Sequence, residues 1–374
     1  MRIRISLVAL TAIICGQVLS PVHALSLPTS FIKYASSVNL AHPGIVLMDP
    51  VTSDVLYSSQ PDVGRAPASV MKLLSATLAS SALDLQSSFH TSIATTSEPD
   101  RYVITGDFDP WLTLSLHEST KFGAALSPTL INKAIERSPS MKRIVIDYYG
   151  LYDKDLEELK KFYRGRVYLS INKLSSLPAA QAKAVEPIAT ITSPTISEIL
   201  KFTLLWSDNT KADRLARLSA KALGFTPDAP GIKLAFEKVL KDLGVTTEGL
   251  EIYDGSGLSK ENRVTARTIA ELLVKIKDKP EFASIYEGLP TAGISGTLQK
   301  RFVEDAPTAV GLVKAKTGWI NGTVSLAGYV TVGEGQYVFA IIADRITPTE
   351  PRRKAARETI DKMLATIAKP IPTN

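Results

Sequence analysis

The sequence predicts an α+β fold in which strands from both ends of the chain form one antiparallel sheet flanked by helices. Near the start, the apolar segments GIVLMD (44–49) and DVLYSS (54–59) flank a turn-like PVTS, a pattern typical of a β-hairpin. Near the end, residues 311–318, 323–332 and 336–343 have the composition of three strands. Because helical patterns fill much of the chain between them, we expect the two ends to meet in one sheet.

Helical spacing of apolar residues supports the flanking helices. A helix is predicted to begin near Pro67 or Ala68, from the spacing of Val70, Leu73, Leu74 and Leu78. Residues 196–225 and 265–277 are also helical in pattern. Residues 351–369, with a proline at their start, predict a closing helix.

A separate unit is expected after the first helix. Residues 88–175 mix a helical pattern around 128–137 with the strand-like segments YVIT, RIVIDYY and RVYLSI. This mixture indicates an inserted α/β domain. We therefore expect a main domain formed by residues 25–87 and 176–374, interrupted by this one insertion.

The first residues have the pattern of a secretory signal peptide. Arg2 and Arg4 precede a short apolar run, and a small residue, Ala24, stands where a signal peptidase cuts, so we expect residues 1–24 to be removed and the protein to be secreted. The only cysteine, Cys15, lies inside this leader, which excludes disulfides and a thiol nucleophile in the mature chain. No later stretch approaches the ~18 apolar residues of a membrane span, so no integral membrane anchor is expected.

Charge and histidine content narrow the function classes. The net charge is 43 − 37 = +6. This balance would favour approach to an anionic cell wall, but ordinary solubility explains it better. No dense basic cluster suited to nucleic acid is present. The histidines of the mature chain are His42, His90 and His117, and their spacing matches no metal site, so we expect neither a metal nor a cofactor.

The segment APASVMKLLS contains a candidate nucleophile and base, Ser69 and Lys72. A serine hydroxyl needs a base to become nucleophilic, and Lys72 lies one helical turn further on the same face. Burial beside a second cation would lower the pKa of Lys72. Taken alone, Ser69 is better explained as a helix cap, since Ser-x-x-Lys also occurs at Ser30–Lys33 and Ser170–Lys173.

Two further motifs follow in the chain. Ser207-Asp208-Asn209 offers a hydroxyl and an amide that can relay a proton and hold a carbonyl, although the same residue types also favour loops and caps. Lys316-Thr317-Gly318 falls on a predicted strand. There it presents a cation and a hydroxyl, while the glycine leaves room for a substrate backbone.

Ser-x-x-Lys, Ser-x-Asn and Lys-Thr-Gly, in this order, are the set used by β-lactamases and penicillin-binding proteins. Longer stretches around them resemble the D-Ala-D-Ala carboxypeptidase/endopeptidase family of low-molecular-weight class C penicillin-binding proteins, peptidase family S13. The resemblance extends from about residue 44 to 345. It is carried by RAPASVMKLLSA, TGDFDPWLT, TSPTISEILKFTLLWSDNTKADRL, YDGSGLSKENRVT, LPTAGISGTLQKRF and VKAKTGWINGTVSLAGYV.

This resemblance implies a penicillin-binding protein/serine β-lactamase-like transpeptidase fold. It implies a secreted D-Ala-D-Ala carboxypeptidase, with D,D-endopeptidase activity as a further option, which trims peptidoglycan stem peptides and is acylated by β-lactams. The resemblance implies that Ser69 is the nucleophile and Lys72 its general base. It implies that Ser207, assisted by Lys316, passes a proton toward the leaving D-alanine, and that Asn209 holds the substrate amide. Lys316 and Thr317 would meet the terminal carboxylate, Gly318 would lie beside the substrate backbone, and the backbone N–H groups of Ser69 and Trp319 would form the oxyanion hole.

Residues outside the three motifs complete the implied substrate site. Asp147, in RIVIDYYGLYD, is the candidate carboxylate for the ammonium group of the stem peptide's diamino acid, and Arg301 is the basic candidate for the carboxylate there. Each is equally explained as an ordinary turn or surface charge. Trp319 replaces the family's small hydroxyl residue after Lys-Thr-Gly, so one carboxylate hydrogen bond is lost and bulk is added at the cleft. The insertion is shorter than in larger family members.

Two alternatives stay open at this point. A serine β-lactamase shares the three motifs, although we find no clear Glu-x-x-x-Asn element to supply a deacylating glutamate. A catalytically weak peptidoglycan-binding protein is compatible with Trp319 and with the reduced insertion. Labelling by penicillin and release of D-alanine separate the three.

Overall fold

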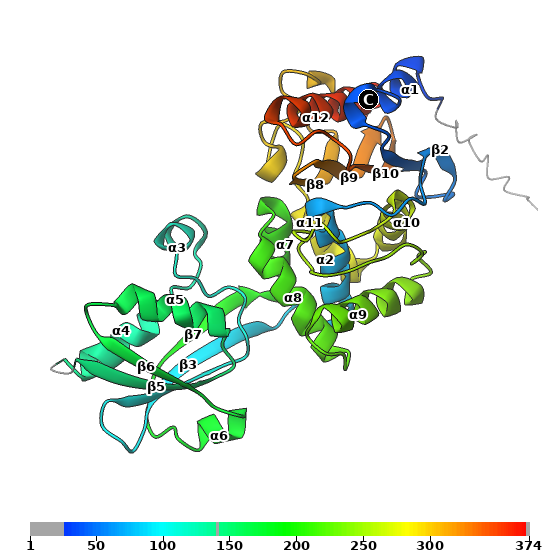
Figure 1. Ribbon diagram of the computed structural model, residues 1–374. Coiled ribbons are helices and arrows are strands. Elements are labelled where there is room, and N and C mark those ends of the chain that lie inside the picture. The colour runs from blue at the N-terminus through cyan, green and yellow to red at the C-terminus, as the bar shows by residue number, and fades with distance from the viewer. Residues whose placement is uncertain (1–25, 140–141, 372–374) are drawn as a thin grey trace, which may run out of the picture.

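Two separate five-stranded sheets organise the chain (Figure 1). The computed structural model describes residues 26–139 and 142–371. The predicted leader, with Cys15 and the cleavage site near Ala24, lies outside the described residues. Within the described ranges, no helix combines the length and the apolar character that a membrane span requires.

The first sheet is antiparallel throughout and joins the two ends of the chain. Its strand order is β2 (Val55–Ser59), β1 (Gly44–Met48), β10 (Gly335–Ala343), β9 (Thr323–Val332) and β8 (Val313–Ile320). β1 pairs with β10 in the register Val46↔Ala340, which places an N-terminal strand beside the last strand. The predicted α+β fold with a sheet built from both ends is therefore confirmed.

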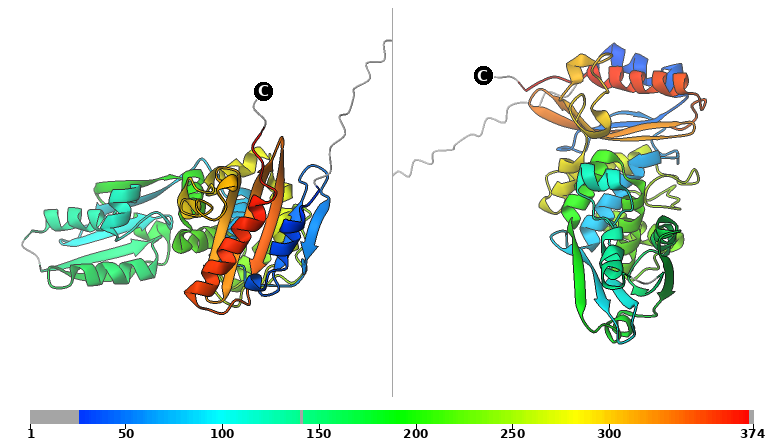
Figure 2. Two further views of the ribbon diagram at one scale, coloured as in Figure 1. Left: turned by 90° about the horizontal axis from the view of Figure 1, so that it is seen from above. Right: turned by 90° about the vertical axis from the view of Figure 1, so that its left-hand side faces the viewer.

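Helices cover both faces of this sheet, as Figure 2 shows. α1 (Thr29–Ala35) and α12 (Glu350–Ala365) lie on the outer face, where Phe31, Phe339 and Leu364 share one apolar core. A larger core fills the other face, between the sheet and α2 (Met71–Ala82), α7 (Ile196–Trp206), α8 (Asn209–Ala222), α9 (Ala229–Asp242), α10 (Ala266–Ile276) and α11 (Ala283–Gly288). Since both faces are covered, the central strands are apolar on both sides instead of alternating.

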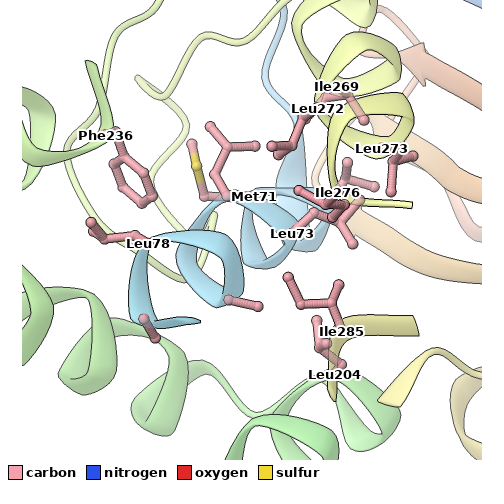
Figure 3. Packing of buried hydrophobic residues seen from close by; sticks show 14 of the residues in the cluster. Met71, Leu73, Leu78, Leu204, Phe236, Ile269, Leu272, Leu273, Ile276 and Ile285 are labelled. Carbon is pink, nitrogen blue, oxygen red and sulfur yellow. The ribbon is translucent and has the colours of Figure 1, made fainter. Parts of the chain in front are cut away.

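The helix α2 lies at the centre of the helical layer. All of its residues from Met71 to Ala79 are buried, so it is apolar on every side. Figure 3 shows Met71, Leu73 and Leu78 pointing in different directions toward side chains of the surrounding helices. The chain enters α2 through a single 3-10 turn, Ala68–Val70, so the predicted helix start near Pro67 or Ala68 corresponds to this turn. Packing on all sides fixes the position of Ser69 at its start.

The second sheet belongs to the inserted unit. Its order is β6 (Tyr168–Lys173), β5 (Arg143–Tyr149), β4 (Arg101–Gly106), β3 (Ser88–Thr95) and β7 (Pro187–Thr195). The unit thus extends to residue 195 instead of the expected 175, because β7 pairs with β3 and closes the sheet. Its helices are α3 (Leu116–Phe122), α4 (Pro128–Arg137), α5 (Asp153–Tyr163) and α6 (Leu177–Gln181).

Candidate active site

Ser69 lies where a strained loop enters α2. Ala68 has a left-handed backbone with φ of 49°, which is uncommon for alanine and is held by the packing around it. Its carbonyl fits against Gly257, where an added Cβ would lie 1.8 Å from the Ala68 oxygen. The loop therefore presents Ser69 in a fixed direction at the start of a buried helix.

Lys72 is 1% exposed and contacts the candidate nucleophile directly. Its Nζ lies 2.8 Å from Ser69 Oγ, and it donates at 2.8 Å to Asn209 Oδ1 and at 2.8 Å to the Ser256 carbonyl. Burial lowers the pKa of Lys72 to about 7, while the charges of Asp208 and Asp254 act to raise it. A substantial fraction of this amine is therefore neutral near pH ~7 and able to accept the Ser69 proton.

Lys316 forms a second contact pair with Ser207. Its Nζ lies 2.9 Å from Ser207 Oγ and 2.8 Å from the Thr317 carbonyl, and the residue is fully buried. Burial, together with the charge of Lys72, holds the pKa of Lys316 well below its usual range. The two lysines thus lie in one desolvated site, Lys72 beside the Ser69 hydroxyl and Lys316 beside the Ser207 hydroxyl.

The turn at Ser207-Asp208-Asn209 breaks what the sequence pattern presents as one long helix. Ser207 ends α7 with a left-handed backbone, φ 62°, and the Asp208 side chain caps α8 by accepting from Lys211 N–H at 2.9 Å. This break turns the Ser207 hydroxyl toward Lys316 and places Asn209, the first residue of α8, against Lys72.

Strand β8 is the outermost strand of its sheet, and among the described residues no other backbone pairs with the second half of its outer edge, which we call the free edge. Residues 290–292 cover its first half, since Ala315 N–H donates to the Pro290 carbonyl at 2.9 Å and Ala292 N–H to the Val313 carbonyl at 2.9 Å. Backbone groups alternate in direction along an antiparallel strand, so those of Thr317 and Trp319 face the same edge further on. A substrate backbone can pair with them there.

Gly318 lets the Ser69 loop approach this strand. A Cβ on Gly318 would lie 2.2 Å from Ser325 Oγ and 3.1 Å from Ser69 N. Ser325 in turn donates to the Pro67 carbonyl at 2.7 Å, which ties the loop to the sheet. The backbone nitrogen of Ser69 and the free edge at Trp319 are thereby brought together, as an oxyanion hole requires.

Trp319 itself lies at the rim. Its side chain is on the same side of β8 as Val313 and Ala315, which pack in the outer core, and it is 60% exposed. The Arg353 guanidinium of α12 lies 5.6 Å from the centre of its ring. The bulk expected at the cleft is therefore directed toward α12, and the backbone N–H remains available at the edge.

Two functional candidates were missed by sequence reasoning. Thr297 Oγ1 lies 2.8 Å from Thr317 Oγ1, beside the point where the covered half of β8 ends. Asp254 accepts from the N–H groups of Ser256 and Gly257, both at 2.7 Å, and so orders the loop whose carbonyl binds Lys72. The turn-forming sequence DGSG was a signal for Asp254. Thr297 lies in LPTAGISGTLQKRF, which carries the family resemblance but does not single out this residue.

The structure does not bring Asp147 or Arg301 into this cluster. Asp147 is fully buried on β5 and bound by Arg101 Nε at 2.9 Å and Lys183 Nζ at 3.0 Å. Arg301 forms an ion pair with Asp361 of α12. Both side chains therefore form ion pairs with other residues of the chain.

A cavity of about 710 Å³ lies beside the cluster, between α8 and the inserted unit. Asn209 and Ser256, which both contact Lys72, are part of its lining, together with Leu258, Tyr152 and Arg214. This cavity continues from the Lys72 contacts away from Ser69, and its volume can hold a substrate longer than two residues. Among the described residues, no group of three or more histidine, cysteine or acidic side chains could hold a metal ion.

Three features now define the class of the protein as that of penicillin-binding proteins and serine β-lactamases. They are a sheet built from both ends of the chain, a buried helix with serine and lysine one turn apart, and Lys-Thr-Gly on the edge strand of the sheet. Within this class, the model of the D-Ala-D-Ala carboxypeptidase 3 (S13) family matches residues 32–114 and 173–367. The chain belongs to this family. Between the two matched segments, residues 115–172 are left unmatched, and they lie in the inserted unit.

Curated relatives carry carboxypeptidase names. Carboxypeptidase DacB of Mycolicibacterium smegmatis is 36% identical over 185 residues, which are 48% of this chain and 39% of the relative. The D-alanyl-D-alanine carboxypeptidase of Actinomadura is 37% identical over 175 residues, or 45% of this chain and 32% of the relative. The matches thus span less than half the length of these two relatives. A carboxypeptidase of Mycobacterium tuberculosis is 26% identical over 350 residues, covering 81% of this chain and 76% of the relative.

Solved structures share the fold. Penicillin binding protein 4 of Haemophilus influenzae matches with a TM-score of 0.65 and 17% identity, covering 85% of this chain and 95% of that one. A predatory endopeptidase of Bdellovibrio bacteriovorus, in complex with an immunity protein, matches with a TM-score of 0.62 and 16% identity, covering 85% and 90%.

Proposed function

We propose that this protein is a secreted serine D-Ala-D-Ala carboxypeptidase that trims peptidoglycan stem peptides and is acylated by β-lactams at Ser69. The observation that carries the proposal is the contact set Ser69–Lys72–Asn209 beside Lys316–Ser207, at the free edge of β8. The carboxypeptidase names of the relatives support the same reaction.

Acylation begins at Ser69. Neutral Lys72 takes the proton from Ser69 Oγ, which attacks the carbonyl of the penultimate D-alanine. The oxyanion that forms is stabilised by the backbone N–H groups of Ser69 and Trp319. When the peptide bond breaks, Ser207 passes its proton to the leaving amine. The proton that Lys72 took from Ser69 returns to Ser207 by way of Lys316, so that Lys72 is neutral again. Water then attacks the acyl-enzyme and gives a proton to the now neutral Lys72, which passes it to Ser69 Oγ as the shortened peptide leaves.

The free edge of β8 orients the substrate. A peptide that continues the antiparallel pairing of residues 290–292 runs from Trp319 toward Thr317, so its terminal carboxylate meets the hydroxyls of Thr317 and Thr297. Toward its other end, the stem peptide extends into the cavity lined by Asn209 and Leu258. Asp147 and Arg301 receive no contact in this arrangement, because both are bound within the chain.

One assay tests the proposed function against its alternatives. The mature protein is incubated with a fluorescent penicillin and, separately, with a diacetylated tripeptide ending in D-Ala-D-Ala. We expect a stable covalent label together with release of D-alanine. Rapid loss of label with penicillin hydrolysis would indicate a β-lactamase, and absence of label and of D-alanine would leave only a binding protein.

Replacing Thr297 by valine tests the carboxylate site. Loss of one hydrogen bond to a charged group costs about 1.5–3 kcal/mol, so kcat/KM on the tripeptide should fall about tenfold or more. Thr297→Ser should keep most of the activity, because it keeps the hydroxyl. Steady-state kinetics measure the effect, with the exposed Thr308→Val as control. Unchanged kcat/KM in Thr297→Val would remove Thr297 from the site.

A further inference from the structure

Lys211 is a buried cation close to the Ser207-Asp208-Asn209 turn. It is 4% exposed, and its Nζ lies 2.8 Å from Asp208 Oδ2 and 3.9 Å from Glu118 Oε2. The ring centres of Trp111 and Phe202 lie 5.3 Å and 5.2 Å from the same nitrogen. We call these four partners, Asp208, Glu118, Trp111 and Phe202, the Lys211 cage.

The inserted unit supplies half of the cage. Trp111 and Glu118 belong to the segment between β4 and α4, whereas Phe202 and Asp208 belong to α7 and the turn after it. α3, which projects from the inserted unit on this segment (Figure 1), also places Phe122 4.9 Å from the Phe202 ring. Glu118 and α3 lie in the part of the chain that the family model leaves unmatched. The cage therefore joins the inserted unit to the active-site turn.

Lys211 holds both oxygens of the Asp208 carboxylate. Its backbone N–H donates to Oδ1 at 2.9 Å, and its Nζ donates to Oδ2 at 2.8 Å. Asp208 lies between Ser207, which contacts Lys316, and Asn209, which contacts Lys72. Fixing Asp208 therefore fixes two of the residues that touch the reacting groups.

Lys211 also offsets a charge that acts on the base. Asp208 and Asp254 act to raise the pKa of Lys72, whereas burial lowers it. Lys316 faces Lys72 from β8 as a further amine. A cation 2.8 Å from Asp208 weakens the field of that carboxylate at Lys72. The other charges near Lys211 are Glu118, Asp109, and Arg214, which is paired with Asp155.

We propose that Lys211, held in its cage by the inserted unit, is a positioning residue that fixes the Ser207-Asp208-Asn209 turn and keeps Lys72 able to act as a base. The inference rests on the proposed function, since it assigns Lys72 that role. The inserted unit thereby sets the activity of the main domain through one buried cation.

The test is the pH profile of acylation. Second-order rates of labelling by fluorescent penicillin are measured from about pH 5 to about pH 9 for wild type, Lys211→Met and Lys211→Arg. In Lys211→Met the acidic limb of the profile should move to higher pH, because the unbalanced Asp208 charge raises the pKa of Lys72. The labelling rate at pH ~7 should fall about three- to tenfold, since one pKa unit is a tenfold change in the neutral fraction of Lys72. At high pH the rate should return to that of wild type. Lys211→Arg should keep the wild-type profile.

Lys221→Met is the matched control. Lys221 lies on the same helix, is exposed, and contacts the inserted unit through the Phe108 ring at 5.3 Å, but it has no contact with Asp208. Its profile should equal that of wild type. Asp208→Asn supplies a second variant in case Lys211→Met does not fold. Removing the carboxylate should move the acidic limb to lower pH.

The outcomes separate the inference from the proposed function. If wild type takes no label, the proposed function fails. If wild type is labelled but Lys211→Met keeps the wild-type profile, or loses rate equally at every pH, the inference is overturned. An acidic limb that stays in place or rises in Asp208→Asn would overturn it as well.

Discussion

Replacing Lys72 by methionine is expected to lower acylation of Ser69 by about 10³-fold, because general bases contribute about 10²–10⁴-fold and Lys72 is the amine in contact with Ser69 Oγ. Methionine keeps the length and apolar stem of lysine, so the packing of α2 should persist. The measurement is the second-order rate of penicillin labelling. Lys33→Met is the matched control, since Ser30-x-x-Lys33 repeats the motif on an exposed face.

The same variant changes how stability depends on pH. The pKa of Lys72 is about 7 in the folded protein and 10.5 in a free side chain, so between these values the unfolded chain binds more protons. Stability of wild type therefore rises with pH across this window. In Lys72→Met this rise should be smaller, as measured by urea unfolding at about pH 7 and about pH 9. An equal rise in both proteins would mean that Lys72 is not desolvated.

Replacing Gly318 by alanine is expected to lower the acylation rate about 10²-fold, since misplacing a reacting group by about 1 Å has an effect of this size. The new Cβ would meet Ser325 Oγ at 2.2 Å and the Pro67 carbonyl at 2.9 Å, so the Ser69 loop must move away from β8. The reacting hydroxyl then separates from the oxyanion edge. Labelling kinetics and thermal unfolding together measure the effect.

Gly335→Ala is the control for this substitution. Gly335 lies on β10 in the same sheet, and an added Cβ would have only ordinary contacts, the nearest at 3.6 Å. Its labelling rate should equal that of wild type. If Gly318→Ala is labelled as fast as Gly335→Ala, the close approach of the loop to β8 has no role in the reaction.

The strands of the main sheet were predictable because burial on both faces leaves continuous apolar runs in the sequence. β7 was missed because polar residues such as Thr190 and Thr192 alternate along a half-exposed strand, which a loop also explains. Ser207 was placed in a helical pattern, since apolar spacing continues across the turn. The residue types of this turn also favour a cap, and the structure places the break at the left-handed backbone of Ser207, with Asp208 capping α8.

The three motifs were predictable from their order, whereas the contacts of single charges were not. Asp147 has its partners Arg101 and Lys183 because parallel pairing of β4 with β5 and the position of α6 bring them together. The partner of Arg301 comes from α12, 60 residues further along the chain. Tertiary packing decides such pairings, and a sequence pattern does not contain them.

Every proposed step of the reaction depends on Ser69 being the nucleophile. The most direct measurement is peptide mapping by mass spectrometry after reaction with benzylpenicillin, with Ser69→Ala treated in parallel. If Ser69 is the nucleophile, one penicilloyl group is found on the peptide that contains Ser69 and none on the variant. An adduct on any other residue, or an equal adduct on Ser69→Ala, would contradict it.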